Sequence, residues 1–572
     1  MSNFLPSPPA PPPNASESDH LDSWKEIAAY LNREVRTLQR WEKLESLPVH
    51  RHQHDTLGSV YAYKSELDEW RRQRQLRPLL GSPLGRKVGP AERRGLARQE
   101  TQTEKIRMIV LPFGNLSGDS GQEYFSDGLT EEMITQLSRL EPLRLGVIGR
   151  TTAMSYKGTG KRIDQIAVEM DVDYLLEGSV RRSADRVRIN AQLIRASDQT
   201  HLWSETYDRD VRDVLVLQDE VAHRIAREIR LALPQRQQVR DVVRRQINPE
   251  AYEAYLKGRS LWYERTGEAL AKSIGHFQDA IQKDPNYALA YAGLADAYGL
   301  LAIIPWDGLC PKEAMPRAKV AALRALELDD SLAEAHSSLA MILHRYDWDW
   351  RGAERSYKRA IELNPNNARP HLWYGWLLMS EGRRDESVTE LKEAEEVAKK
   401  IDPLGLVDIR ASLANSLYMA REYDGAIEEC RGANELNPGY FLSHYVLGRS
   451  YAQKGMYGKA LSVLKKALSV NASNLLLVAA LGHTYALSGD RAKALDMLKE
   501  LKGLRKKRYI PAIYFAAIYS GLHEKDEAFA WLEKGFQERS DGMTYLKIER
   551  LFDSLHSDPR YQDLMKRVGL SN

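Results

Sequence analysis

The first patterned stretch of the chain predicts two short helices followed by a β-hairpin. A Ser-x-x-Glu capping box at 23–26 precedes hydrophobic residues at helical spacing. A second helix is expected from Val35, with its hydrophobic side chains facing the first helix. Polar and apolar residues then alternate over 49–54 and 59–63, which is typical of two paired strands. These elements predict a small folded module over residues 21–74.

The second patterned stretch, residues 105–234, mixes strand and helix periods. The runs IRMIVLP and LRLGVIGR predict strands, and the run EYFSDGLTEEMITQLSRL predicts a helix between them. A further helix, KRIDQIAVEM, precedes two or three strands, and VLQDEVAHRIAREIRLAL predicts a closing helix. Strand–helix–strand alternation followed by a hairpin favours a compact α/β (α+β) domain.

From residue 249 the pattern becomes repetitive. The small residues Ala426, Ala460, Ala494 and Ala528 lie 34 positions apart each time. A helix–turn–helix period of this length is the tetratricopeptide signature, in which small residues let paired helices approach closely. The sequence therefore predicts an all-α solenoid of about eight repeats over residues 249–572.

Composition narrows the class of protein. Of the 572 residues, 43% are hydrophobic and 28% charged, which is typical of a soluble multidomain protein. The net charge of +3 means that any contact with nucleic acid has to be local. We expect a proline-rich disordered lead over 1–20, without the pattern of a secretory signal, and a basic linker over 75–104. No apolar run is long enough for a membrane span, so a cytoplasmic protein is expected.

The second helix of the first module carries the candidate DNA-binding chemistry. Arg36, Arg40 and Lys43 fall on the side opposite its hydrophobic residues. A helix in the DNA major groove needs this combination of apolar anchoring and long cationic side chains. The alternative is a solvated face on a protein-binding module, since residues 21–74 hold ten Lys and Arg against nine Asp and Glu.

The phrases SWKEIAAYL, VRTLQRWEK, LPVHR and VYAYKSELDEW resemble the winged helix-turn-helix of the MerR and phage-excisionase type. The resemblance implies that residues 21–74 bind double-stranded DNA, with contacts from a recognition helix and a β-wing. The implied DNA-binding residues are Arg33, Arg36, Thr37, Arg40 and Lys43 of the recognition helix and Arg51, His52 and His54 of the wing.

Residues 105–234 resemble the N-terminal domain of TolB and related FlgO-like domains. The phrases that carry the resemblance are VLPFGNLSGDSGQEYFSDGLTEEMITQLSRL, TTAMSYKG, DYLLEGSVRRSADRVRINAQLI and HLWSETYDRD. This family implies no enzymatic role. Together with the repeats, the chain resembles CadC-like bacterial regulators that lack the membrane span.

No motif for catalysis or for a cofactor is complete. The stretch KGTGKR lacks the first glycine and the hydroxyl residue of a phosphate-binding loop. His50, His52 and His54 alternate as on one face of a strand, but no fourth zinc ligand is apparent. Cys310 and Cys430 are the only cysteines and cannot form a zinc site by themselves. We therefore expect no enzyme, no metal and no cofactor.

A solenoid of this length offers a concave groove for a protein or peptide partner. The best hypothesis is a DNA-binding transcriptional regulator whose solenoid recruits that partner, and a homo-oligomer is possible on a palindromic site. The rival hypothesis is a tetratricopeptide interaction scaffold that does not bind DNA. By repeat position, the candidate groove residues are Trp376, Asn415, Tyr445, Arg449 and His483.

Overall fold

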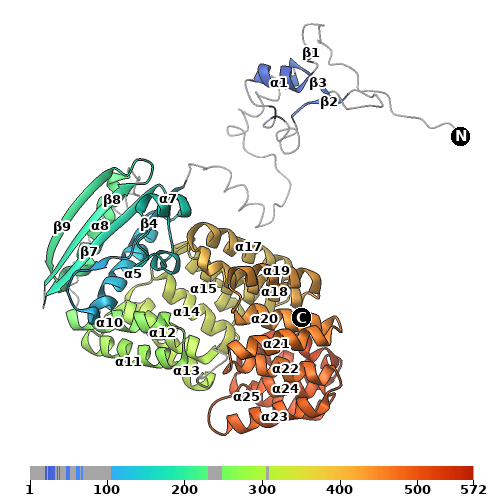
Figure 1. The fold of residues 1–572 in the computed structure, drawn as a ribbon. Helices are drawn as coiled ribbons and strands as arrows, with labels where there is room; N and C mark the ends of the chain where they lie inside the picture. Colours follow the sequence, from blue (N-terminus) through green and yellow to red (C-terminus); the bar gives the residue numbers. More distant parts are fainter. Residues whose placement is uncertain are drawn as a thin grey trace. The chain divides into compact units, whose positions relative to one another are not determined.

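A computed structural model gives the structure of the chain, and its contacts divide the chain into two units, residues 1–102 and 103–572 (Figure 1). The expected lead over 1–20, apart from His20, and the expected linker over 75–104 lie outside the described residues. The structure describes residues 20–21, 23–31, 35, 38, 47–51, 60–64, 66–67, 105–183, 186–229, 248–303 and 308–570.

The described part of the first unit contains a helix and three short strands. Strand β3 pairs antiparallel with β1 and with β2, so the two strands that the alternating pattern predicted are hydrogen-bonded to each other. The Ser23 hydroxyl accepts a hydrogen bond of 3.2 Å from the backbone N–H of Glu26, as in a capping box. A small core that includes Ile27 and Leu38 holds the elements together. These elements are β1 (His20–Leu21), α1 (Trp24–Leu31), β2 (His50–Arg51) and β3 (Val60–Tyr63).

The second unit begins with a mixed sheet in the order β6-β4-β7-β8-β9, with β5 paired to β7. Strand β4 runs parallel to both β6 and β7, whereas β7, β8 and β9 are antiparallel. The elements are β4 (Ile106–Val110), β5 (Gly114–Asn115), α5 (Glu123–Leu140), β6 (Leu145–Val147), α6 (Arg150–Met154), α7 (Ile163–Met170), β7 (Tyr174–Ser183), β8 (Arg186–Arg195), β9 (His201–Asp210) and α8 (Val214–Glu228), with short 3-10 turns η2 (Ser120–Gln122) and η3 (Val211–Asp213).

Alternation of side chains explains how this sheet packs. In β8, Val187, Ile189, Ala191 and Leu193 are buried, and the residues between them point the other way. Helices α5 and α8 pack against each other and against the sheet (Figure 1). The predicted strand–helix–strand order and the closing helix are therefore confirmed, and α6 is an additional short helix that the sequence pattern did not indicate.

Antiparallel helix pairs form the rest of the second unit (Figure 1). They are α10 (Pro249–Tyr263), α11 (Gly267–Lys283), α12 (Ala288–Ile303), α13 (Pro311–Leu328), α14 (Ala333–Ile342), α15 (Trp350–Leu363), α16 (Ala368–Ser380), α17 (Arg384–Ile401), α18 (Leu406–Met419), α19 (Tyr423–Leu436), α20 (Phe441–Gln453), α21 (Tyr457–Val470), α22 (Leu475–Leu487), α23 (Arg491–Arg505), α24 (Ala512–Gly521), α25 (Lys525–Glu538) and α26 (Pro559–Val568). The π-helical stretch η4 (Leu343–Asp347) and the 3-10 helices η5 (Pro403–Gly405), η6 (Asp541–Tyr545) and η7 (Arg550–Leu555) lie between them.

Small residues set the spacing of the helix pairs, as the 34-residue pattern predicted. The alanines at 426, 460, 494 and 528 are all fully buried. A methyl group added at Gly448 of α20 would lie 2.6 Å from a side-chain carbon of Leu464 in α21. Any larger residue at this crossing would force Leu464 to move, because the leucine fills the space of a Cβ.

Replacing Gly448 with valine is expected to lower the free energy of unfolding by about 1–3 kcal/mol, because the added carbons overpack the α20–α21 contact. The matched control is Gly458→Val in α21, where no atom lies within 4 Å of an added Cβ and the residue is exposed. The control should change stability by no more than about 0.5 kcal/mol. Chemical denaturation of both variants measures the difference, and equal losses would contradict the steric explanation.

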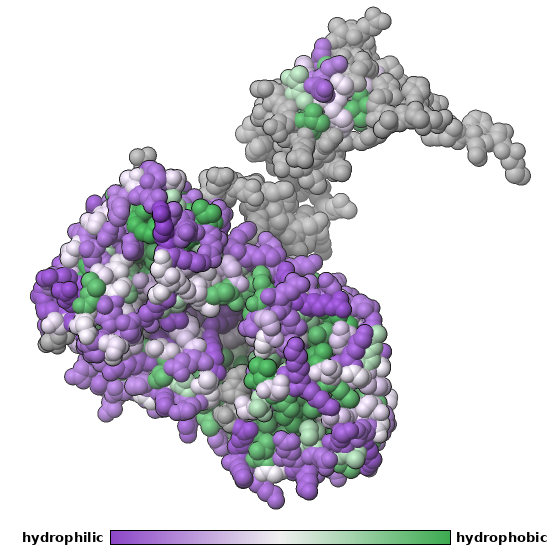
Figure 2. Space-filling model, viewed as in Figure 1, coloured by the Kyte–Doolittle hydropathy of each residue, from purple (hydrophilic) through white to green (hydrophobic). Residues whose placement is uncertain are grey.

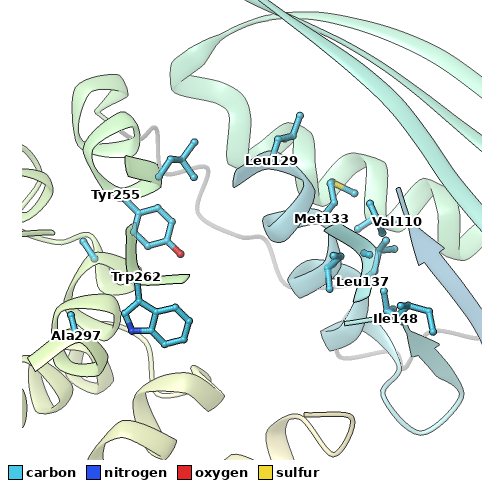
Figure 3. Packing of buried hydrophobic residues seen from close by; sticks show 14 of the residues in the cluster. Val110, Leu129, Met133, Leu137, Ile148, Tyr255, Trp262 and Ala297 are labelled. Atoms are coloured by element: carbon cyan, nitrogen blue, oxygen red, sulfur yellow. The ribbon is translucent and has the colours of Figure 1, made fainter. Parts of the chain in front are cut away.

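The hydrophobic core continues from the sheet into the solenoid without a break. Figure 3 shows Leu129, Met133 and Leu137 of α5 under the sheet, and Tyr255 of α10 on the side of the solenoid. A Cβ added at Gly128 would lie 2.6 Å from a side-chain carbon of Leu256, so α5 and α10 are in close contact. The α/β domain and the solenoid therefore form a single body.

The C-terminal segment folds back onto earlier repeats. Arg345 of η4 forms an ion pair of 2.5 Å with Asp541 of η6. Arg421, in the turn after α18, pairs with Asp553 of η7 at 2.8 Å. The indole N–H of Trp350 donates a hydrogen bond of 3.2 Å to the carbonyl of Val568. These contacts tie the end of the chain to the middle of the solenoid.

Among the described residues, no helix combines the length and the apolar character needed to cross a membrane.

Candidate functional site

The predicted DNA-binding side chains lie almost entirely outside the described part of the chain. This holds for Arg33, Arg36, Thr37, Arg40, Lys43, His52 and His54. The backbone of Arg51 is part of β2, but its side chain is also outside the described part. Their role in DNA binding stays a prediction.

His50, the first of the alternating histidines, has neighbours within the described module. Its Nε2 lies 2.7 Å from a carboxylate oxygen of Glu66, and its ring stacks on Tyr61 with centroids 5.1 Å apart. In the described ranges, no cluster of three or more His, Cys, Asp or Glu residues has the spacing of a metal site.

The inner side of the solenoid contains a cavity of about 660 Å³. Figure 2 shows hydrophobic residues gathered over α22 and α24 beside a hollow in the surface. Four of the five predicted groove residues line this cavity: Trp376, Asn415, Tyr445 and Arg449. Because these residues come from α16, α18 and α20, the first helices of successive repeats form the inner wall.

His483 is the predicted groove residue that does not line the cavity. It is 5% exposed, and a Cβ added at Gly521 of α24 would lie 2.9 Å from its ring. Burial and the positive charge of Arg449 lower the pKa of His483 to about 3. His483 of α22 is therefore a neutral residue packed against α24.

Arg449 is buried rather than open to a partner. Its guanidinium donates a hydrogen bond of 2.9 Å to the Tyr445 hydroxyl and stacks 4.2 Å from the Tyr418 ring centroid. It also forms an ion pair with Glu549, which lies between η6 and η7. The C-terminal segment thus contributes carboxylates to two arginines of the cavity wall, Arg449 and Arg345.

The cavity wall is largely hydrophobic and also contains charged groups. The hydrophobic part includes Trp373, Phe441, Leu475, Leu476 and Ile513. Leu475 and Ile513 belong to α22 and α24, over which Figure 2 shows the apolar surface. This arrangement is typical of sites that bind an apolar body and orient it by a few polar groups.

Besides the ion pairs of Arg345 and Arg449, the wall has a second charged group, formed by Arg265, Arg369 and Asp408 and called the polar end here. The guanidinium carbons of Arg265 and Arg369 lie 3.7 and 4.9 Å from the ring centroid of Trp262. The Asp408 carboxylate accepts a hydrogen bond of 2.6 Å from the Tyr440 hydroxyl, and burial raises its pKa. Burial and the charge of Arg369 lower the pKa of Arg265.

A second cavity, of about 320 Å³, lies where the solenoid meets the α/β domain. Arg369 and Asp408 line both cavities. Next to the second cavity, the Thr152 hydroxyl donates a hydrogen bond of 2.8 Å to Asp402. The polar end of the inner cavity is thus continuous with the junction of the two domains.

Two segments of the second unit are similar to known families of domains. Residues 104–224 match the second domain of HilA/YgeH-like transcriptional regulators. Residues 442–474 match the tetratricopeptide repeat, in agreement with the 34-residue period. Both matched segments lie in the second unit of the structure.

Two curated relatives extend this similarity. The chain is 36% identical over 239 residues to "Putative adenylate cyclase 3" of Rhizobium meliloti, which is 42% of this chain and 40% of the relative. It is 21% identical over 342 residues to the transcriptional regulator HilA of Salmonella typhimurium, or 59% of this chain and 58% of HilA. The chain thus spans about half the length of these relatives. Among solved structures, PilF of Pseudomonas aeruginosa aligns at 21% identity and a TM-score of 0.30, over 39% of this chain and 92% of that chain.

Proposed function

We propose that this protein is a DNA-binding transcriptional regulator. The observation that carries the proposal is the match of residues 104–224 to a domain of HilA/YgeH-like transcriptional regulators. Similarity to HilA over 59% of the chain supports it. A DNA partner would place the protein with the chromosome in the cytoplasm.

In this proposal the first unit contacts DNA as a winged helix-turn-helix of the MerR and excisionase type. The capped helix α1 and the antiparallel pair β2–β3 support it, since such modules combine short helices with a β-wing. Base edges would be contacted by Arg36, Thr37 and Arg40. Phosphates would be contacted by Arg33, Lys43, Arg51, His52, His54 and the basic linker over 75–104.

The second unit would receive the regulatory input. We propose a TolB-like role for the α/β domain as connector and a protein or peptide contact for the solenoid, with Trp376 and Asn415 on its inner wall as contact residues. The more buried Tyr445, Arg449 and His483 would hold that wall in shape. Homo-oligomers on a palindromic site are part of the same proposal.

The similarity to a protein named as an adenylate cyclase favours a shared regulatory segment rather than a shared reaction. The aligned segment is 40% of that relative, so the greater part of the relative lies outside it. We propose that the shared segment is joined to different activities in the two proteins. In this chain that activity is DNA binding, without an enzymatic reaction. The rival role is a scaffold that contacts only proteins.

Selection of random DNA duplexes on the full-length protein is expected to enrich one recurring motif. The Arg36→Ala/Arg40→Ala double variant should lose that enrichment, because each side chain that contacts a base edge contributes about 1–3 kcal/mol of discrimination. The measurement is the enrichment of the motif, followed by its affinity at several salt concentrations.

The matched control removes two arginines with the same spacing from the solenoid. Arg351 and Arg355 are exposed on α15, and the Arg351→Ala/Arg355→Ala variant should enrich the same motif as the unmodified protein. Affinity that falls steeply with salt would support phosphate contacts. No enrichment, or equal enrichment in both double variants, would favour the scaffold.

A further inference from the structure

We propose that the inner cavity of the solenoid binds a small organic anion with an apolar body, such as a fatty carboxylate. The inference goes beyond the proposed function and does not rest on DNA binding, because the cavity lies in the second unit and its binding can be measured without DNA. Trp376 and Asn415 line this cavity, so the small anion takes the place of the peptide contact proposed for them above.

The size of the cavity favours a small molecule over a peptide strand or a helix. Its volume of about 660 Å³ lies within the range of roughly 300–1,000 Å³ that is usual for small-ligand pockets. The C-terminal segment reduces the space, since Asp541, Tyr545, Glu549 and Phe552 are part of the wall. An extended partner would have to displace residues such as Phe552, which is fully buried.

The hydrogen-bond donors of Arg265 at the polar end favour an anionic ligand. Asp296 is the carboxylate that lies within ion-pair reach of Arg369, at 3.8 Å, and no described carboxylate lies within that reach of Arg265. Asp408 of the same wall accepts a hydrogen bond from the Tyr440 hydroxyl and attracts both guanidinium groups. The guanidinium of Arg265 therefore has planar N–H donors without a described carboxylate in ion-pair reach, and such donors suit a carboxylate or a phosphate.

The backbone at Arg265 gives independent support. Arg265 is the middle residue of the turn between α10 and α11, with φ of 57°. The same position is occupied by glycine in three other repeats, at Gly382, Gly455 and Gly489 with φ of 78°, 71° and 84°, and by a side chain in two, at Arg421 and His523 with φ of 66° and 60°. A side chain in this left-handed region is strained, and such strain is concentrated at functional positions.

Another repeat shows what a cation at this turn position can do. Arg421 occupies the middle of the turn between α18 and α19, with φ of 66°, and its guanidinium pairs with Asp553 at 2.8 Å. Arg265 has the same backbone conformation and stacks on Trp262 at the edge of the cavity. An anionic ligand would give Arg265 the ion-pair partner that Asp553 gives Arg421.

The position of Arg369 links ligand binding in the inner cavity to the junction with the α/β domain. Arg369 lines both the inner cavity and the cavity at the domain junction. An anion bound at Arg369 would compete with Asp296, which lines the junction cavity and accepts a hydrogen bond from Ser338 at 2.8 Å. Occupancy of the cavity would thus change the electrostatics at the junction with the α/β domain.

Titration calorimetry of the full-length protein tests the proposal with decanoate as the probe. We expect decanoate to bind at least about tenfold more tightly than the uncharged decanol, because only the acid engages the two arginines. Arg369→Met should weaken decanoate binding by about tenfold or more. Arg351→Met is the matched control on the exposed face of α15 and should leave binding unchanged.

Arg265→Gly separates binding from folding. Glycine is the residue that other repeats use at this turn, so the variant should unfold at the same temperature as the unmodified protein or a higher one. Its affinity for decanoate should nevertheless fall by about tenfold or more. A variant that is equally stable and binds decanoate equally well would overturn the role of Arg265 and with it the proposal.

Comparison with other ligands identifies the anionic group that the cavity binds. Tighter binding of decyl phosphate than of decanoate would support the proposal and identify a phosphate ligand, and the reverse order would identify a carboxylate. Equal binding of decanol and decanoate, or binding of a short apolar peptide with a free carboxylate but of neither acid, would overturn it. None of these results bears on the Arg36→Ala/Arg40→Ala experiment, so the two proposals fail separately.

Discussion

Replacing Glu549 with alanine is expected to lower the free energy of unfolding by about 3–5 kcal/mol, because it leaves a buried charge without its partner. Arg449 is 3% exposed and pairs with Glu549, which is 10% exposed. The guanidinium would keep the Tyr445 hydroxyl and the Tyr418 ring as neighbours, and neither carries a compensating charge. Denaturant unfolding of the full-length protein, followed by circular dichroism, measures the loss.

The control for this prediction is an ion pair of the same type at the surface. Asp526 is 95% exposed and pairs with Arg560 at 2.9 Å. Asp526→Ala is expected to change stability by no more than about 1 kcal/mol, because solvent screens an exposed pair. Similar losses in the two variants would mean that Arg449 reaches solvent when Glu549 is removed, and would contradict the burial on which the prediction rests.

Glu132→Gln is expected to stabilise the protein by about 3 kcal/mol near pH 8 and to have little effect near pH 5. Glu132 of α5 is 3% exposed at the junction with α10 and accepts a hydrogen bond of 2.9 Å from the Tyr255 hydroxyl. Burial, together with the negative charge of Glu131, raises the pKa of Glu132 from 4.5 to about 7. Glutamine keeps an oxygen that accepts the bond from Tyr255 and carries no charge.

The sign of this effect follows from proton binding. Between about pH 4.5 and 7 the folded protein binds a proton at Glu132 that the unfolded chain does not, so stability falls as the pH rises through that window. The glutamine variant lacks this loss. Unfolding free energies of both proteins at the two pH values test it, with Glu264→Gln at an exposed position as the control. A variant that is less stable near pH 8 would contradict the prediction.

Local patterns were enough to predict the elements of the second unit. The 34-residue period placed the alanines at 426, 460, 494 and 528 in the core, where they are fully buried. The alternation around the sheet predicted the order of its strands and helices. Both patterns depend on contacts within one element or between neighbouring elements, and such contacts leave a regular trace in the sequence.

Contacts between distant parts of the chain leave no such trace. Glu549 is 100 residues from Arg449, and Asp541 is 196 residues from Arg345, so neither carboxylate was predicted to line the cavity. The repeat positions placed Trp376 and Asn415 at the cavity but could not reveal that Arg449 is covered. Arg265 was missed as well, although an arginine at a turn where other repeats have glycine was a readable signal.

The continuous core between α5 and α10 was also beyond the sequence pattern. Residues 105–234 and 249–572 each have a complete pattern of their own, which predicted two separate domains. The contact depends on the shape of two surfaces, as at Gly128 and Leu256, where the absence of a side chain admits a leucine. The candidate DNA-binding side chains of the first unit lie outside the described residues and stay a prediction.

The tie between the C-terminal segment and the middle of the solenoid has a consequence for synthesis on the ribosome. Repeat proteins can usually fold as they emerge, because each repeat contacts only its neighbours. Here Arg345 and Arg449 leave the ribosome long before Asp541 and Glu549, and their buried positions lack counter-charges until those residues follow. The middle repeats of a nascent chain therefore stay incompletely packed, and the wall of the inner cavity is completed only in the last stage of translation.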